Sequence, residues 1–139
     1  MKKFLSRSFA IFLLLALCCS LCVSASATVY SSDYLNRYSG SVSAQGNGII
    51  KISFSVAGMQ KLAELGASEI VVQKKVGSSW IEVETYTKDD YPELSTTNAA
   101  MYSNYVLYEG VAGTEYRAEI TIFGNTDYRT FTTTSKRAT

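Results

Sequence analysis

The sequence has 139 residues, no histidine, and 13 basic against 12 acidic residues, which leaves a formal net charge of +1. A balance this close to neutral lacks the clustered lysine and arginine with which proteins bind nucleic acid, so we expect no nucleic-acid partner. Without histidine the chain lacks the usual general base at neutral pH, and it cannot form a Ser-His-Asp or Cys-His catalytic arrangement.

The N-terminal segment has the three parts of a secretory signal peptide. Three basic residues come first, an apolar stretch follows over residues 9–23, and the small residues Ala-Ser-Ala close it at 25–27. This pattern predicts cleavage between Ala27 and Thr28, so that residues 1–27 are the signal peptide and contact the membrane only before cleavage.

Cleavage at this position also removes all three cysteines, Cys18, Cys19 and Cys22. The remaining residues 28–139 are expected to form a single secreted domain, which is long enough to bury a core without disulfide bonds. Without cysteine or histidine it has no soft ligands for zinc or copper, so we expect no metal and no cofactor. An uncleaved membrane anchor and a lipidated cysteine are the alternatives to release.

Alternation of apolar and polar residues begins after a glycine-rich turn. Ile50, Ile52, Phe54 and Val56 alternate with lysine and serine, which predicts a half-buried strand with one solvated face. The Gly-Asn-Gly sequence at 46–48 favours a tight turn before this strand. Residues 38–44 should therefore form the preceding strand.

A different spacing interrupts the alternation. Met59, Leu62 and Leu65 recur every three residues, and Gly66 follows where a helix usually ends. This spacing predicts a short helical turn at one end of the fold, too short to be stable on its own.

Alternation then returns and predicts further strands, which lie at 70–74, 80–87, 102–108, 116–122 and 128–134. The segment Lys88–Ala100 is polar and without period, and it contains the only proline, so we expect one long loop there. About seven antiparallel strands with turn signals roughly every 8 to 12 residues predict an all-β, two-sheet sandwich.

The run Gly113-Thr114-Glu115-Tyr116 resembles the entry to the penultimate strand of fibronectin type III domains. The resemblance covers residues 68–134 and implies an immunoglobulin- or fibronectin-like sandwich. It also implies a tyrosine corner, in which the Tyr116 hydroxyl bonds to the backbone a few residues upstream.

The whole mature chain is also similar to small uncharacterised secreted proteins of Gram-positive bacteria. These proteins share the Gly-Asn-Gly strand, the Met-x-x-Leu-x-x-Leu-Gly turn and the tyrosine-rich later half. This second resemblance implies a fold and a compartment, and no activity.

Asp89, Asp90 and Glu93 form the only acidic cluster of the chain. Paired carboxylates can hydrolyse glycosides, and a carboxylate cluster can hold calcium, although the spacing here lacks the usual calcium-loop pattern. The ordinary interpretation is a polar loop kept soluble by its charges. A secreted inhibitor that inserts loop 88–100 into a target is a further hypothesis.

Tyrosine is the residue type that most favours a binding role. All ten tyrosines follow the predicted cleavage site, and exposed tyrosines stack on sugars or offer rigid contact area to proteins. The candidate contacts are Tyr91, Tyr102, Tyr105 and Tyr108, and alternation places Tyr105 on the opposite strand face from Tyr102 and Tyr108. The alternative is that tyrosine is simply favoured in strands.

Trp80 follows a turn, and we interpret it as a core residue or a cover at the rim rather than a platform for sugars. Taken together, the patterns predict a secreted, non-enzymatic interaction module that binds an extracellular protein or glycan. A small carboxylate-dependent hydrolase remains the alternative from another class.

Overall fold

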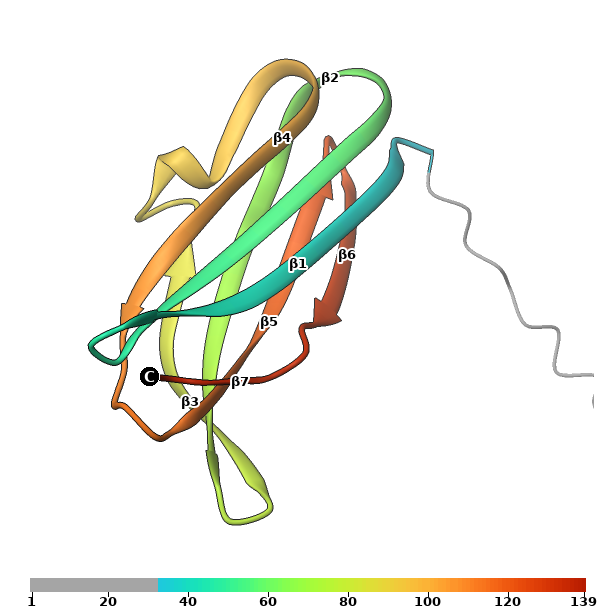
Figure 1. Ribbon diagram of the computed structural model, residues 1–139. Coiled ribbons are helices and arrows are strands. Elements are labelled where there is room, and N and C mark those ends of the chain that lie inside the picture. The colour runs from blue at the N-terminus through green and yellow to red at the C-terminus, as the bar shows by residue number, and fades with distance from the viewer. Residues whose placement is uncertain (1–32) are drawn as a thin grey trace, which may run out of the picture. The chain divides into compact units, whose positions relative to one another are not determined.

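Residues 33–139, the part of the chain that the computed structural model describes, contain seven antiparallel strands paired into one sheet (Figure 1). The elements in chain order are β1 (Leu35–Gly46), β2 (Ile49–Val76), β3 (Ser79–Thr87), the 3-10 turn η1 (Pro92–Leu94), β4 (Ser95–Glu109), β5 (Glu115–Gly124), β6 (Asp127–Thr132) and β7 (Lys136–Arg137). The predicted signal peptide and its cleavage site between Ala27 and Thr28 lie outside the described residues. Within the described part, none of the helical structure is long and apolar enough to cross a membrane.

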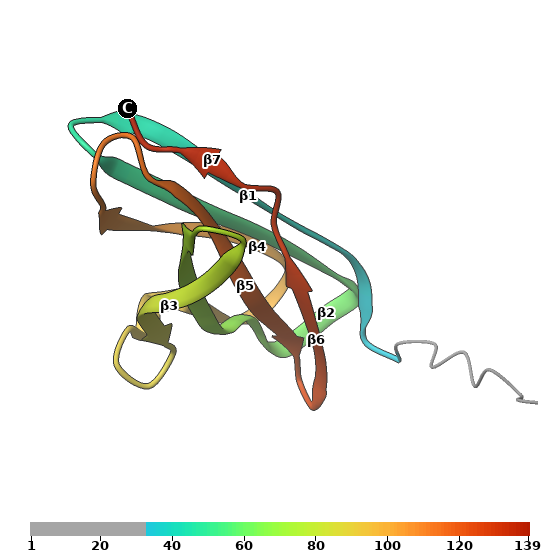
Figure 2. The same cartoon turned by 90° about the horizontal axis from the view of Figure 1, so that it is seen from below.

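The central strand of the sheet is β2, which pairs with four neighbours. Residues 49–57 pair with β1 on one side and with β4 on the other. Residues 62–66 pair with β4 again, and the rest of the strand pairs with β5 and β3. Figures 1 and 2 show β2 running beside β1 and β4, turning over, and returning beside β5. Because one continuous strand belongs to both halves, the sheet curls into a half-barrel.

The predicted two-sheet sandwich is therefore wrong, although the all-β antiparallel class is confirmed. The expected strands at 50–56 and 70–74 are two parts of β2, and pairing runs without a break from β1 through β2 and β5 to β6. A sandwich and a curled sheet both bury one face of each strand, so alternation alone does not distinguish them.

The predicted helical turn at Met59–Leu65 is also wrong, because these residues belong to β2. Ala57 pairs with Met101 and the next residue paired with β4 is Leu62, opposite Ala99, so residues 58–61 form a bulge relative to β4 where the strand bends. A bulge shifts the alternation by adding residues to one strand. It thus gives the same three-residue apolar spacing as a turn of helix. The helical element of the described chain is η1 instead.

The expected long loop at 88–100 is much shorter than predicted. β3 ends at Thr87 and β4 begins at Ser95, so strand pairing with β2 covers the second half of the segment. Leu94, which ends η1, is fully buried with 0% exposure. The start of β4 was not predicted from the sequence because the strand begins with Ser-Thr-Thr-Asn, residues that usually indicate loops.

The core lies inside the curl. Alternate residues of β2 and β5 point inward, as the alternation at 50–56 predicted, and Phe54 is only 2% exposed. Its ring centroid lies 6.1 Å from that of Tyr102. The core residues of these two strands are Ile50, Ile52, Phe54, Val56, Leu62, Leu65, Ala67, Ile70, Val72, Tyr116, Ala118, Ile120 and Ile122.

The two ends of the sheet, β1 and β6, approach each other across the open side of the half-barrel without backbone pairing. Side chains fill this gap: the rings of Tyr38 and Phe131 lie 5.2 Å apart between centroids. At one end of the curl, β7 pairs with the start of β5, and Ala138 is buried in the core.

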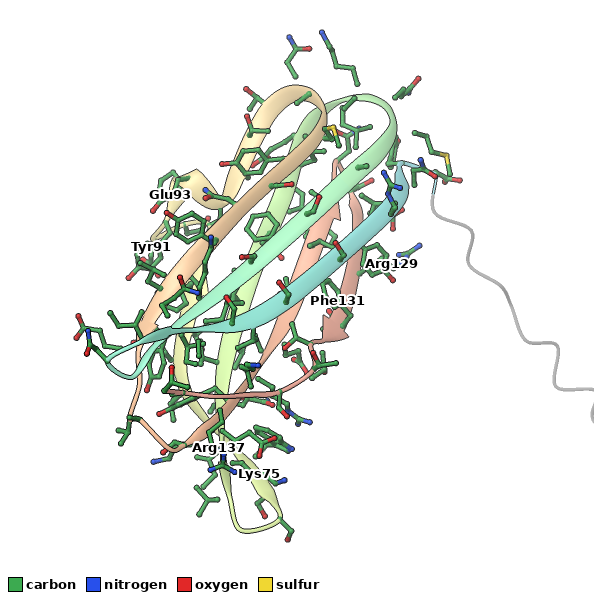
Figure 3. The ribbon with its side chains drawn as sticks, in the orientation of Figure 1. Lys75, Tyr91, Glu93, Arg129, Phe131 and Arg137 are labelled. Atoms are coloured by element: carbon green, nitrogen blue, oxygen red, sulfur yellow. The ribbon has the colours of Figure 1, made fainter. Side chains whose placement is uncertain are left out.

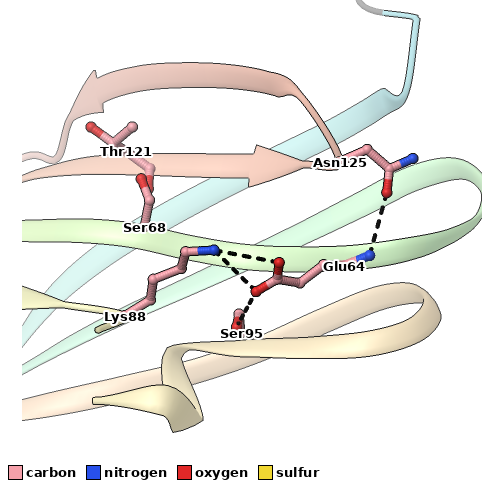
Figure 4. A network of polar contacts seen from close by, with 6 residues as sticks. All are labelled: Glu64, Ser68, Lys88, Ser95, Thr121 and Asn125. Carbon is pink, nitrogen blue, oxygen red and sulfur yellow. Dashed lines mark hydrogen bonds and ion pairs between the residues drawn. The ribbon is translucent and has the colours of Figure 1, made fainter. Parts of the chain in front are cut away.

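A small polar network secures the bend of β2 (Figure 4). The Glu64 carboxylate accepts hydrogen bonds from the Ser95 hydroxyl at 2.9 Å and from the Lys88 ammonium at 3.1 Å. The Ser95 hydrogen bond is the main reason that the pKa of Glu64 lies below its ordinary value. Asn125, in the turn between β5 and β6, accepts from the backbone N–H of Glu64 at 3.3 Å. These groups satisfy one another, which indicates a structural role.

Candidate functional site

Tyr116 lies in the core and is 2% exposed. Its hydroxyl oxygen accepts a hydrogen bond of 2.9 Å from the backbone N–H of Val111, five residues upstream. The ring meets Tyr108 edge to face at 5.5 Å. It also lies so close to Gly110 that a Cβ there would come within 2.8 Å of the ring. Tyr116 therefore fixes the turn between β4 and β5.

Removal of this hydroxyl by Tyr116→Phe is expected to lower the free energy of unfolding by about 1 to 1.5 kcal/mol, because the Val111 N–H loses its partner. Thermal or urea denaturation measures the change. Tyr128→Phe, at an exposed tyrosine, is the control and should leave the melting curve unaltered. A Tyr116→Phe protein as stable as the parent would show that the hydrogen bond contributes nothing.

The four tyrosines predicted as surface contacts do not lie together. Tyr102 and Tyr108 occupy the half-buried face of β4, and Tyr105 occupies the exposed one. The Tyr102 hydroxyl donates to the carbonyl of Glu93, and burial raises the pKa of Tyr108 above its ordinary value. Both side chains are thus committed to packing.

Tyr91 belongs to the short turn after β3, and Figure 3 shows it next to Glu93. Its ring meets Tyr86 edge to face at 5.2 Å. Tyr86 in turn donates its hydroxyl hydrogen to the Leu107 carbonyl at 3.1 Å, and burial raises its pKa to about 12. The Tyr86 hydroxyl therefore links β3 to β4.

The three residues of the acidic cluster lie together on the short segment between β3 and β4. Asp89, Asp90 and Glu93 are exposed on the turn, and Asp90 accepts a hydrogen bond of 2.9 Å from the Thr87 hydroxyl. Among residues 33–139, no group of three or more acidic, cysteine or histidine side chains is arranged to hold a metal ion.

Trp80 is half-buried on the outer face of β3, and its ring is covered. The guanidinium of Arg117 lies 4.3 Å from the ring centroid and is held there by a 2.7 Å hydrogen bond to Gln73. This arrangement is a cation–π contact within the sheet face. The ring face under Arg117 is therefore not free for a sugar.

A polar hollow of about 350 Å³ lies near the tips of the β2–β3 and β4–β5 turns, and Lys75, Glu115 and Arg137 contribute its charges. Figure 3 shows Lys75 and Arg137 close together in this region. The charges are already partnered: Lys75 pairs with Glu115 at 3.8 Å, and Arg137 donates to the Gly113 carbonyl. A hydrogen bond from Ser135 is the main cause of the lowered pKa of Glu115.

The outer face of β1, the first part of β2, and β4 has a different character. Serines occupy it in cross-strand rows: Ser39 pairs with Ser55 and Ser41 with Ser53, and Ser55 also pairs with Ser103. Their side chains are short, so a shallow open hollow of about 400 Å³ remains above the sheet. We call this surface the serine face; its hollow is lined by Ser39, Gly40, Ser41, Ser53, Phe54, Ser55 and Ser103.

Tyr105 stands beside the serine hollow, in the row of Ser41 and Ser53. It is 48% exposed, and the Lys51 ammonium lies 4.2 Å from its ring centroid. The other exposed tyrosines of the described chain each contact an aromatic ring: Tyr38 is tilted against Phe131, Tyr91 meets Tyr86 edge to face, and Tyr128 stacks on Phe123. Tyr105 is the exposed tyrosine of residues 33–139 without such a partner.

Sequence reasoning named Tyr105 but missed the serine face around it. The signal was present, because serine occurs at every second position over 39–43 and 53–55. Comparison with protein-family models and with curated proteins found no match to this chain. The geometry of the serine face is thus the main guide to function.

Proposed function

We propose that this protein is a secreted, non-enzymatic binding module whose serine face holds a carbohydrate chain. The observation that carries the proposal is the hollow lined by serine hydroxyls beside Tyr105, an exposed ring with no aromatic partner. Serine hydroxyls both donate and accept hydrogen bonds, as sugar hydroxyls do. The Tyr105 ring adds a flat apolar surface with a polar edge, and a sugar ring would stack on the face opposite the one that the Lys51 ammonium covers.

The shape of the site favours a polymer over a small molecule. Small-molecule sites are usually concave clefts that enclose most of the ligand. The serine hollow is open above and lies on three neighbouring strands, so a chain can cross it and leave at either end.

The composition of the face favours a glycan over a protein partner. The cores of protein–protein interfaces are rich in large apolar and aromatic residues and poor in serine. Here the central row consists of Ser39, Ser55 and Ser103, and the Ser103 hydroxyl donates to Ser55 at 2.8 Å. The predicted export signal, and the absence of histidine and cysteine after the predicted cleavage site, support an extracellular role that does not depend on catalysis.

Tyr105→Ala is expected to weaken binding to polysaccharide about tenfold, because the stacking surface is lost. The measurement is affinity electrophoresis of the full chain, produced with its own N-terminal segment, in gels that contain a panel of soluble bacterial and plant polysaccharides. Tyr128→Ala is the matched control, since Tyr128 is 49% exposed and belongs to β6, away from the serine face. It should not change the mobility shift.

A second variant, Ser53→Gln, fills the hollow without altering charge and should reduce binding as much as Tyr105→Ala. If no polysaccharide of the panel retards the protein, or if both variants bind as the parent does, the proposal is wrong. Binding to a protein through Tyr105 in place of any glycan would also contradict it.

A further inference from the structure

Two cations mark the ends of the serine face. Arg37 stands opposite Ala57 in the register, one row before the first serine row, and Lys51 stands opposite Ser43, in the last row that contains a serine. Both belong to the outward-facing set of residues, with the serines between them. Neither has a carboxylate within ion-pair distance among the described residues.

The rows between these cations contain no acidic side chain. Their members are Ala57 and Met101 beside Arg37, then the serine rows with Tyr105, then Ser43 and Leu107 beside Lys51. The first acidic residue of this face is Glu109, one row further along β4. Residues 51 and 57 are about 20 Å apart along an extended strand. The hydroxyl-lined hollow therefore has a positive charge without a carboxylate partner at each end, and the Lys51 ammonium also contacts the Tyr105 ring.

We propose that the polysaccharide held by the serine face is acidic, a chain of sugars that carry carboxylates, lying from Arg37 across the serines to Lys51. This inference rests on the proposed function, and it adds the chemical class of the ligand. Charge complementarity is its basis, because a polyuronide repeats its carboxylates along the chain and meets both cations at once.

The Tyr105 ring decides between carboxylated sugars and other polyanions. A linear polyphosphate or glycerol phosphate chain would meet Arg37 and Lys51 but offers no ring to stack on Tyr105. A uronic acid offers a ring and a carboxylate in the same unit. Planar bidentate pairing between guanidinium and carboxylate also suits Arg37.

The test compares polymers that differ in charge alone. Isothermal titration calorimetry of the full chain with sodium polygalacturonate and sodium alginate, and with the methyl ester of each, gives the affinities. We expect each acidic polymer to bind about fivefold more tightly than its ester at 0.1 M NaCl, as two exposed ion contacts provide. At 1 M NaCl, where the Debye length falls from about 10 Å to about 3 Å, this difference should disappear.

The second part of the test removes the positive charges from the protein. Lys51→Gln and Arg37→Gln should each weaken binding to the acidic polymers severalfold and leave binding to their esters unchanged. Lys136→Gln, an equal loss of charge on exposed β7, is the control and should have no effect. The unchanged affinity for the esters shows that Lys51→Gln has not displaced Tyr105.

Three results would overturn the inference. Equal, salt-independent affinity for acid and ester, or binding to neutral glycans of the panel alone, would leave carbohydrate binding intact and remove its acidic preference. Tight binding of poly(glycerol phosphate) that Tyr105→Ala does not weaken would show a general polyanion site. Binding to no polysaccharide at all would remove the proposed function together with this inference.

Discussion

Replacement of Phe54 by alanine is expected to lower the free energy of unfolding by about 3 to 5 kcal/mol, since the change leaves a cavity at a fully packed position. The phenyl ring is 2% exposed and contacts Tyr102. It lies in the part of β2 that pairs with both β1 and β4. Because strands on both sides hold this part of β2 in place, the backbone cannot move in to fill the cavity. Urea denaturation followed by tyrosine fluorescence measures the loss.

The neighbouring substitution Ser53→Ala is the control for Phe54→Ala. It changes the same strand on its outer face and is expected to alter stability by less than about 0.5 kcal/mol. A cost below about 1 kcal/mol for Phe54→Ala would mean that the inner and outer faces of β2 have been assigned the wrong way round.

Gly66→Ala is expected to destabilise the protein by about 3 kcal/mol, because the added methyl group clashes with backbone atoms of the neighbouring strand, whose position is fixed by strand pairing. A Cβ at this position would lie 2.5 Å from the Cα of Ser95. Gly66 pairs with Ser95 in the register of β2 and β4. Relief of the contact therefore requires the two strands to separate at the start of β4. Thermal unfolding monitored by circular dichroism checks the prediction.

Gly46→Ala is the control for Gly66→Ala, because it introduces backbone strain without a steric clash. Gly46 has a φ of +90°, but a Cβ there would meet nothing within 4 Å. Its substitution should cost only about 1 kcal/mol, the strain of a side chain at positive φ. Equal losses at the two glycines would contradict the argument from close approach.

Local sequence patterns predicted the strands well and their assembly poorly. The alternation over Ile50–Val56 can be recognised in the sequence because the polarity of each residue indicates whether it faces the core or the solvent. Whether two strands belong to one sheet or to two depends on pairing between residues far apart, such as Ile70 with Ile120. The bulge at 58–61 similarly depends on the partner strand. A bulge is recognised only when the paired strand is known to have fewer residues over the same stretch.

The part of the candidate site that β1 and β2 form could have been predicted from the sequence. Once Gly46-Asn47-Gly48 is taken as a tight turn, a hairpin register follows and places the serines of 39–43 beside those of 53–55. Ser103 and Tyr105 join them from β4, about fifty residues later, and no local pattern gives that register. Arg37 and Lys51 become the ends of one surface only after this pairing is known.

The central position of β2 also has a consequence for how the chain folds. Leu65 pairs with Gly124 and Lys74 with Tyr116, so the second half of the strand stays without its main partner until most of the polypeptide is present. Pairings over such long stretches of sequence make folding slow. Until β5 arrives, the chain presents an apolar strand with a free edge, which is the feature that recruits strands from other molecules and leads to aggregation.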